Sequence, residues 1–135
     1  RRLQLRGEVK GIKVYDDFAH HPTAIKTTLE GVKASCQGKV IAILEPRSNS
    51  MKSGVHKAHM ADALSSADHV FFYEPPGLKW DIRDAMKVAT TPVEIKNDVA
   101  DIVSQVADVA SQDDKIVVMS NGSFDDIHNR IIKAL

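Results

Sequence analysis

Two carboxylates and two imidazoles fall within six consecutive positions of the stretch DDFAHHPTAI, residues 16–25. Three roles fit such side chains: binding of a metal ion, acid–base catalysis, or a hydrogen-bonded polar corner. Neighbouring residues of a strand point to opposite faces, so Asp16 and Asp17 cannot easily reach one ion, and the metal site is disfavoured. A simpler role is a hydrogen bond between Asp17 and a ligand hydroxyl, with His21 at the start of a helix. The acid–base role and the polar corner stay open, because a sequence does not reveal a pKa.

A second polar segment, EPRSNSMKSG at residues 45–54, follows an apolar run. Arg47 and Lys52 lie in it among serines and Asn49. Charge-assisted hydrogen bonds from such side chains hold carboxylates or phosphates, so the segment is a candidate anion-binding loop. The alternative is a solvated surface loop, since exposed arginine and lysine need no function.

The third polar segment, SNGSFDD at residues 120–126, contains Ser120, Asn121 and Ser123. It supplies hydroxyl groups and flexible backbone directly before a predicted helix, whose free N–H groups favour an anion. Alternatively, Ser123 is only the N-cap of that helix, with Asp126 three residues further on in a near capping-box arrangement.

Other side chains have weaker functional interpretations. Trp80 follows Pro75-Pro76-Gly77 and either stacks on a ligand ring or closes a small satellite core. His56 and His59 are spaced as metal ligands on one helix face, yet no further ligand pair completes a site. Neither glycine-rich phosphate-binding motif, G-x-G-x-x-G or G-x-x-x-x-G-K-[ST], occurs in the chain. These features therefore do not by themselves identify a site.

The elements that would position these segments alternate between strand-like and helix-like patterns. Residues 3–9 and 12–18 flank Lys10-Gly11 with partly alternating apolar side chains, which predicts a hairpin. Continuous short apolar runs predict strands covered on both faces at 40–44, 70–73 and 116–119. Helical spacing predicts helices over 22–38, 53–65, 98–110 and 124–135, with a weaker strand at 92–95 and a short helix at 80–87.

This alternation predicts a doubly wound α/β domain: a mostly parallel sheet that begins with a β-hairpin and carries helices on both faces. In open α/β sheets, ligands bind beyond the carboxyl ends of the strands. The segments that follow residues 18, 44, 73 and 119 should therefore share one rim. All three polar segments described above lie there.

Length and composition limit the class of protein. The 135 residues suit a single domain. The 18 basic and 18 acidic side chains cancel, so the chain has no net charge that would attract nucleic acid or an anionic membrane surface. Cys36 is the single cysteine, so no internal disulfide forms and a reducing compartment fits best. We expect a soluble, cytoplasmic protein with no membrane span. The first residues, Arg1-Arg2-Leu3, include no methionine, and we expect a fragment of a longer protein.

RRLQLRGE followed by VYDDFAHHPTAI resembles the opening of the C-terminal domain of the Mur ligases, ATP-dependent enzymes that build the peptide stem of peptidoglycan. EPRSNSMKSG and MSNGSFDDIH resemble one branch of that family. That branch joins the tripeptide L-Ala-γ-D-Glu-meso-diaminopimelate to UDP-N-acetylmuramate in peptidoglycan recycling. The similarity covers nearly the whole chain. It implies that residues 1–135 form one Rossmann-like C-terminal domain, without the N-terminal UDP-sugar domain and the central ATPase domain.

The resemblance also implies a chemistry and a division of roles. Mur ligases form an acyl-phosphate with ATP, and the incoming amine then displaces phosphate. By this resemblance Asp17 holds the ATP ribose, Arg2 lies against the adenosine or phosphate portion, and His21 lies near the incoming substrate. Mg2+ would be bound mainly by the central domain. The isolated domain would contain no catalytic residue and would be inactive.

Peptide binding is expected in the loops, at Arg47, Asn49, Lys52, Ser120, Asn121 and Ser123. Alanine-adding relatives carry Pro-His-Arg where this chain has Pro46-Arg47-Ser48, a departure that suits a larger ligand with several carboxylates. The expected partners are ATP, UDP-N-acetylmuramate, the tripeptide and the central domain, with no nucleic acid and no membrane. Two alternatives stay open: a ligase adding L-alanine, and a stand-alone α/β module that binds a small anionic metabolite.

Overall fold

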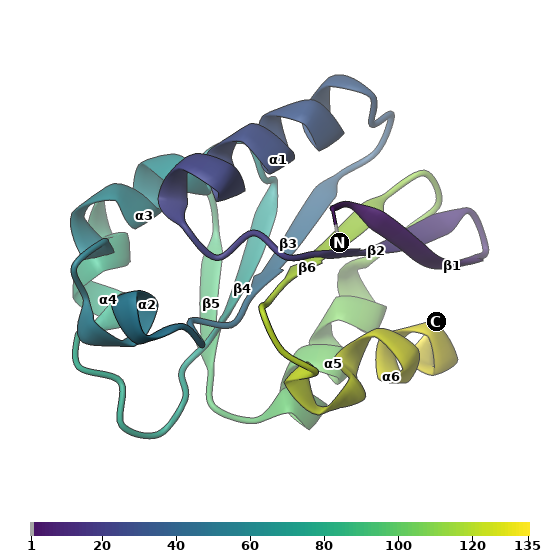
Figure 1. Cartoon of the computed structure of the whole chain (residues 1–135). Coiled ribbons are helices and arrows are strands. Elements are labelled where there is room, and N and C mark those ends of the chain that lie inside the picture. Colours follow the sequence, from purple (N-terminus) through teal and green to yellow (C-terminus); the bar gives the residue numbers. More distant parts are fainter. Residues whose placement is uncertain (1) are drawn as a thin grey trace.

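The computed structural model describes residues 2–135, which form one six-stranded sheet with helices on both faces (Figure 1). The strand order is β1-β2-β6-β3-β4-β5. Only β1 and β2 pair antiparallel, and every other neighbouring pair is parallel. The fold class expected from the sequence is confirmed. The strands are β1 (Gln4–Val9), β2 (Ile12–Asp17), β3 (Val40–Leu44), β4 (His69–Tyr73), β5 (Val93–Lys96) and β6 (Lys115–Met119).

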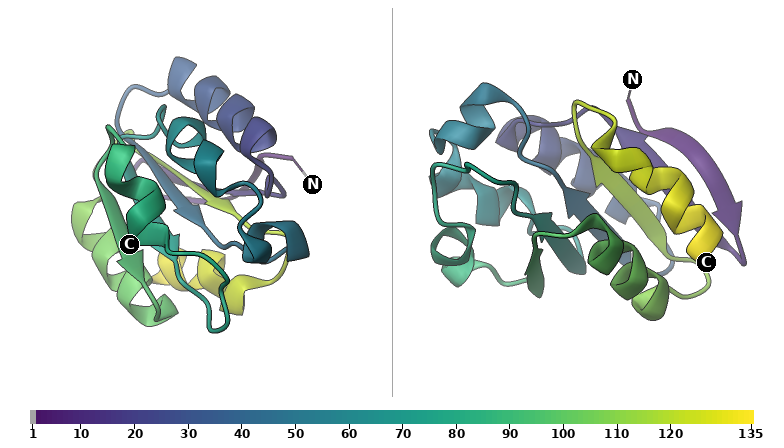
Figure 2. Two further views of the ribbon diagram at one scale, coloured as in Figure 1. Left: turned by 90° about the vertical axis from the view of Figure 1, so that its left-hand side faces the viewer. Right: turned by 90° about the horizontal axis from the view of Figure 1, so that it is seen from below.

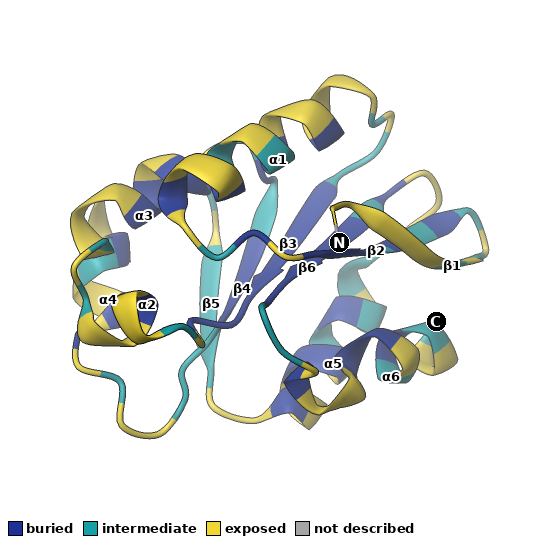
Figure 3. Ribbon diagram, in the orientation of Figure 1, coloured by how far each residue is buried: buried dark blue, intermediate teal, exposed yellow. Residues whose placement is uncertain are grey.

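Helices cover the sheet in two layers, α1, α3 and α4 on one face and α5 and α6 on the other (Figure 2). The central strands are the most deeply buried part of the molecule, because apolar side chains of both helix layers cover them (Figure 3). Within residues 2–135, no helix combines the length and apolar character needed to cross a bilayer. The helices are α1 (Pro22–Ala34), α2 (Asn49–Ser53), α3 (Lys57–Ala63), α4 (Ile82–Ala85), α5 (Val99–Val109) and α6 (Ile127–Ala134), with single turns at Met86–Val88 and Phe124–Asp126.

The elements agree with the sequence patterns except in the extent of three helices. The helix predicted over 22–38 ends at Ala34, and residues 124–126 of the helix predicted over 124–135 form a turn with positive φ angles, so that α6 begins at Ile127. Lys10 and Gly11 both have positive φ angles, as the tight turn of the predicted hairpin requires. The helix predicted over 53–65 is wrong in its extent. A short helix ends at Ser53, Gly54 takes the left-handed conformation that ends helices, and α3 begins only at Lys57. Gly54 also lies directly against Trp80, where a side chain would not fit without movement.

A buried carboxylate fixes the end of the sheet opposite to the predicted rim. Asp114 accepts hydrogen bonds from the backbone N–H groups of Lys39 (2.7 Å) and Ser111 (2.8 Å), and its Oδ2 lies 2.9 Å from Nζ of Lys39. Burial alone would raise the pKa of Asp114, but these hydrogen bonds and the Lys39 charge outweigh it and hold the pKa below its usual value. The ionised carboxylate therefore stabilises the fold.

This lowered pKa predicts acid sensitivity. A carboxyl group whose pKa is lower in the folded state stabilises the protein above its unfolded pKa, about 3.9 for aspartate, and this contribution is lost as the pH falls through the folded pKa. Asp114→Asn should therefore lower the free energy of unfolding at pH 7 and make it less dependent on pH between about 2 and 5. Urea unfolding across that range would test this. An unchanged pH dependence would contradict the assignment.

Candidate functional site

The loops that follow β2, β3 and β6 are joined by hydrogen bonds at the carboxyl ends of these adjacent parallel strands. The backbone N–H of Ser120 donates to the carbonyl oxygen of Asp17 (3.2 Å), and that of Glu45 donates to the carbonyl oxygen of Met119 (3.1 Å). All three loops thus leave the sheet at one edge. The shared rim predicted from the strand pattern is confirmed.

Asp17 lies at the end of β2, where the residue is 4% exposed. One carboxylate oxygen accepts the backbone N–H of Ala19 (2.7 Å) and the other accepts that of Leu3 (2.9 Å). Asp17 therefore fixes the N-terminal segment beside the loop after β2. A hollow of about 240 Å³ lies there, lined by Arg2, Asp17, Phe18, Ala19, His20, His21, Ala24 and Thr28. The structure thus brings Arg2, Asp17 and His21 together, while their contacts with a nucleotide stay predictions.

His21 caps the first turn of α1, where its Nδ1 accepts the backbone N–H of Thr23 at 3.4 Å. Its ring packs edge-on against His56, with the ring centroids 4.4 Å apart. Desolvation, followed by repulsion from His21 and His59, lowers the pKa of His56 and so favours its neutral form. His21 thus belongs both to the hollow beside Asp17 and to a second one, of about 390 Å³, that includes His56 and His59.

Glu45, a residue that sequence reasoning left out of the site, supports the loop after β6. Its buried carboxylate accepts a hydrogen bond from the hydroxyl group of Ser120. The oxygen of that hydroxyl group accepts a hydrogen bond from the backbone N–H of Gly122 (3.0 Å). Ser120 is fully buried, so in this structure it supports the loop from beneath, and its predicted peptide contact remains untested. A signal for Glu45 was available, because this acidic residue directly follows a buried strand.

Arg47 joins the loops after β3 and β6. Its side chain crosses the backbone of Gly122 so closely that a methyl group at position 122 would collide with Nε of Arg47 and lie 2.6 Å from Cδ. Arg47 itself is exposed. Its cation is therefore available to a ligand while the loop after β6 orients its stem.

Asn49 and Lys52 lie on the exposed side of α2, a helix capped by Ser48, whose Oγ accepts the N–H of Met51. The loop after β4 holds this helix in place. The indole N–H of Trp80 donates to the carbonyl oxygen of Met51 (2.7 Å), and the N–H of Lys79 donates to that of Lys52 (3.0 Å). Trp80 is buried against Phe72, so the interpretation of Trp80 as core is confirmed.

Asn121 and Ser123 lie in the loop after β6. Ser123 is exposed at the start of the Phe124–Asp126 turn and makes no side-chain capping bond, so its predicted capping hydrogen bond is absent from the described residues. Oδ1 of Asn121 is buried and accepts no hydrogen bond within residues 2–135. The following turn is left-handed, with φ angles of 49°, 52° and 56° at Phe124, Asp125 and Asp126. Such backbone is costly for residues other than glycine.

Asp16 and Asp17 diverge, as strand geometry requires. Asp16 faces α6, where Nε2 of His128 lies 3.0 Å from its Oδ1, and the two side chains are only 2% and 5% exposed. This pair fastens α6 to β2 immediately behind the rim, and sequence reasoning missed it because the partners are separated by 112 positions. Within residues 2–135, no group of three or more metal-ligating side chains could hold an ion.

A mostly parallel α/β sheet with a hollow at the end of β2, and with Arg47 and Lys52 exposed on the loop and helix after β3, defines a domain of the doubly wound type, a class in which ligands bind at the carboxyl ends of the strands. The comparisons with known proteins identify its family. Residues 1–122 match the family described as the Mur ligase, glutamate ligase domain. The chain therefore belongs to the Mur ligase family.

Two relatives and two solved structures are particularly similar. UDP-N-acetylmuramate–L-alanyl-γ-D-glutamyl-meso-2,6-diaminoheptandioate ligases from Escherichia coli and Haemophilus influenzae are 43% and 44% identical over the whole chain, which spans 30% of each relative. A murein peptide ligase from Psychrobacter arcticus superposes with a TM-score of 0.86 at 43% identity, covering 99% of this chain and 29% of that one. A single crystallised domain from a candidate ligase of this kind in Haemophilus ducreyi superposes with a TM-score of 0.83 at 36% sequence identity. The match covers 98% of both chains.

Proposed function

We propose that the full-length protein is an ATP-dependent ligase that joins L-alanyl-γ-D-glutamyl-meso-diaminopimelate to UDP-N-acetylmuramate. Residues 1–135 would be its C-terminal domain, which binds the incoming peptide and completes the ATP site. One observation carries this proposal: identity over the whole chain is 43–44% with the tripeptide ligases, against 30–31% with L-alanine ligases that also match the whole chain. The exposed cations of the rim support it, because the tripeptide carries several carboxylates.

The residues of the rim fit their proposed partners. Arg2 lies in the hollow beside Asp17, where a cation suits a phosphate-containing ligand. The donor set offers no ion-binding cluster within residues 2–135, so we assign the Mg2+ ligands to the central domain. Bound there, Mg2+ would offset the negative charge of the ATP phosphates. The acyl-phosphate would form at the central domain, and this domain would orient the peptide amine and exclude water. We assign the reaction to the cytoplasm, where ATP and UDP-sugars occur.

Arg47→Ala in the full-length enzyme is the first test. Loss of a charge-assisted hydrogen bond to a peptide carboxylate costs about 1.5 to 3 kcal/mol, which corresponds to a KM for the tripeptide raised roughly 10- to 150-fold. The KM for ATP should change little, because the proposed nucleotide contacts, Asp17 at the end of β2 and Arg2 beside it, lie away from the loop after β3. Steady-state kinetics with each substrate varied in turn would measure both. Equal effects on the two KM values would overturn the assignment.

Asp17→Asn is the reciprocal control in the same assay. Asparagine keeps the size of the side chain but replaces one acceptor oxygen by an NH2 donor. This donor would face one of the two backbone N–H groups, of Leu3 or Ala19, that now donate to Asp17. The expected result is impaired use of ATP with a smaller effect on the tripeptide KM. An unchanged ATP dependence would remove Asp17 from the proposed nucleotide site.

The two rival functions give different results with the wild-type protein. An alanine-adding ligase would turn over free L-alanine in preference to the tripeptide. A stand-alone module for a small anionic metabolite would bind its ligand without the rest of an enzyme and would show no ATP-dependent ligation. Comparing L-alanine with the tripeptide in one ligation assay therefore separates all three.

A further inference from the structure

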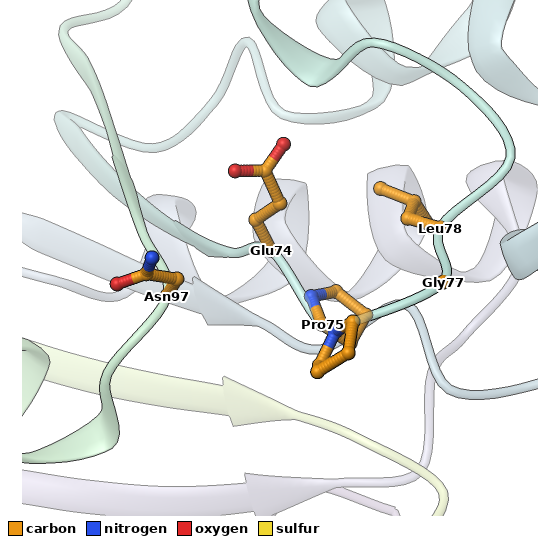
Figure 4. Close-up of a pocket in the computed structure, with 6 residues that line it drawn as sticks. Glu74, Pro75, Gly77, Leu78 and Asn97 are labelled. Carbon is orange, nitrogen blue, oxygen red and sulfur yellow. The ribbon is translucent and has the colours of Figure 1, made fainter.

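A hollow of about 410 Å³ lies beyond the carboxyl ends of β4 and β5, at the far end of the rim from Asp17. Figure 4 shows the carboxylate of Glu74 extending between the side chains of Asn97 and Leu78, away from the ring of Pro75. The surface of the hollow is mainly polar, with one anionic group and one amide beside the side chains of two prolines and a leucine. It is lined by Glu74, Pro75, Pro76, Gly77, Leu78 and Asn97.

Glu74 is the unusual member of this group. It is only partly exposed, and within residues 2–135 its carboxylate forms no ion pair and no hydrogen bond. Its backbone is fixed, since its N–H donates to the carbonyl oxygen of Lys96 at 2.7 Å. The side chain of the exposed Asn97 is likewise without a hydrogen bond in this part of the chain. A carboxylate beside apolar proline and leucine side chains attracts a cation more strongly than one in open water.

A metal ion is not the best occupant of this hollow. Calcium takes six to eight oxygen ligands, and magnesium takes six in a strict octahedron that usually includes substrate phosphates, whereas the hollow offers one carboxylate and one amide. A single ammonium group needs only two or three acceptors. The Glu74 carboxylate and the Asn97 amide oxygen supply that number.

The position of the hollow fits one end of the proposed peptide. Adjacent strands lie about 4.8 Å apart, so β4 and β5 are about 5 and 10 Å from β3, where Arg47 is carried. Three extended residues span roughly 10 Å, which reaches from the centre of the rim to this hollow. The backbone N–H of Lys79 in the loop after β4 donates a hydrogen bond to the carbonyl oxygen of Lys52 in α2. This bond holds the hollow next to the loop that carries Arg47.

We propose that Glu74 and Asn97 bind the ammonium group at the distal end of the diamino acid in the incoming peptide. This inference rests on the proposed function and adds to it a residue that determines specificity. Arg47 and Lys52, on the loop and helix after β3, would hold the carboxylates of the peptide, and Glu74 would select a third residue whose side chain ends in an amine. Glu74 contacts the substrate far from the reacting amine, so it contributes to binding and not to the chemical step.

The test compares wild-type and Glu74→Gln full-length enzyme with two peptides. One is L-alanyl-γ-D-glutamyl-meso-diaminopimelate, and the other carries 2-aminopimelate in third place, which lacks only the distal amine. With the first peptide, Glu74→Gln should raise KM about tenfold or more, the effect of losing a charge-assisted hydrogen bond, without changing kcat or the KM for ATP. With the second peptide, wild type and variant should have the same KM. Glu30→Gln, an exposed charge removal on α1, is the matched control.

The outcomes are distinguishable. An unchanged tripeptide KM in Glu74→Gln, or an equal rise with both peptides, overturns the ammonium site while the proposed function stands if wild type still ligates the tripeptide. Wild-type enzyme that ligates neither peptide overturns both proposals. A thermal melt of Glu74→Gln matching that of wild type shows that any rise in KM arises from binding and not from unfolding.

Discussion

His128→Ala is expected to destabilise residues 1–135 by about 3 to 5 kcal/mol, because it removes the partner of a buried carboxyl group and leaves a cavity. His128 and Asp16 lie 3.0 Å apart between α6 and β2, and both are almost completely buried. Alanine would take the imidazole from a carboxylate that has little access to water, and would leave a cavity as well. Urea unfolding followed by circular dichroism would measure the change.

The exposed His59→Ala provides the control, because it removes the same ring from α3 with an expected change within about 0.5 kcal/mol. A second variant, Asp16→Asn, replaces the carboxyl group of the other partner while keeping the volume of the side chain. Should His128→Ala cost less than about 1 kcal/mol, the pair would not stabilise the packing of α6 against β2.

Trp80→Ala is expected to have an effect of similar size, about 3 to 5 kcal/mol. Trp80 is 8% exposed, packs edge-on against Phe72 with ring centroids 5.8 Å apart, and donates its indole N–H to the carbonyl oxygen of Met51. Because this bond and the contact with Gly54 hold α2, the substitution should also release the helix that carries Lys52. The full-length variant should therefore show a raised tripeptide KM in addition to lower stability.

Trp80→Phe separates packing from hydrogen bonding. Phenylalanine keeps most of the apolar contact but cannot donate to Met51, so its stability should lie between that of wild type and Trp80→Ala. Thermal unfolding of residues 1–135 would rank wild type, Trp80→Phe and Trp80→Ala by stability. If Trp80→Ala retained wild-type stability and lost only peptide binding, Trp80 would be a ligand contact and not part of the core.

Much of the fold could be predicted because its signals are local. Continuous apolar runs identified β3, β4 and β6, and the spacing of Ile25, Leu29 and Val32 identified α1. The error at residues 53–65 arose at Gly54, a glycine that ends the short helix Asn49–Ser53 in the left-handed conformation typical of glycine after a helix. Strand order was beyond reach as well. It is decided by which strands pair, and no single segment contains that information.

The candidate site was foreseeable in its location but not in its interior. Polar residues after consecutive strands predicted the rim, because the carboxyl ends of parallel strands share one edge. The buried links between Glu45 and Ser120, and between Asp16 and His128, depend on contacts over 75 and 112 positions of sequence. Glu74 was visible as a polar residue after a strand. Its carboxylate has no partner among residues 2–135, and this property, which makes it a candidate for ligand binding, belongs to the folded protein alone.

The contact between Arg47 and Gly122 has a consequence for how the rim tolerates substitution. A methyl group at position 122 would collide with Nε of the exposed Arg47, so Gly122→Ala requires the arginine side chain to turn away from its present direction. A substitution in the loop after β6 would therefore change how the cation of the loop after β3 is presented, without any change at Arg47 itself.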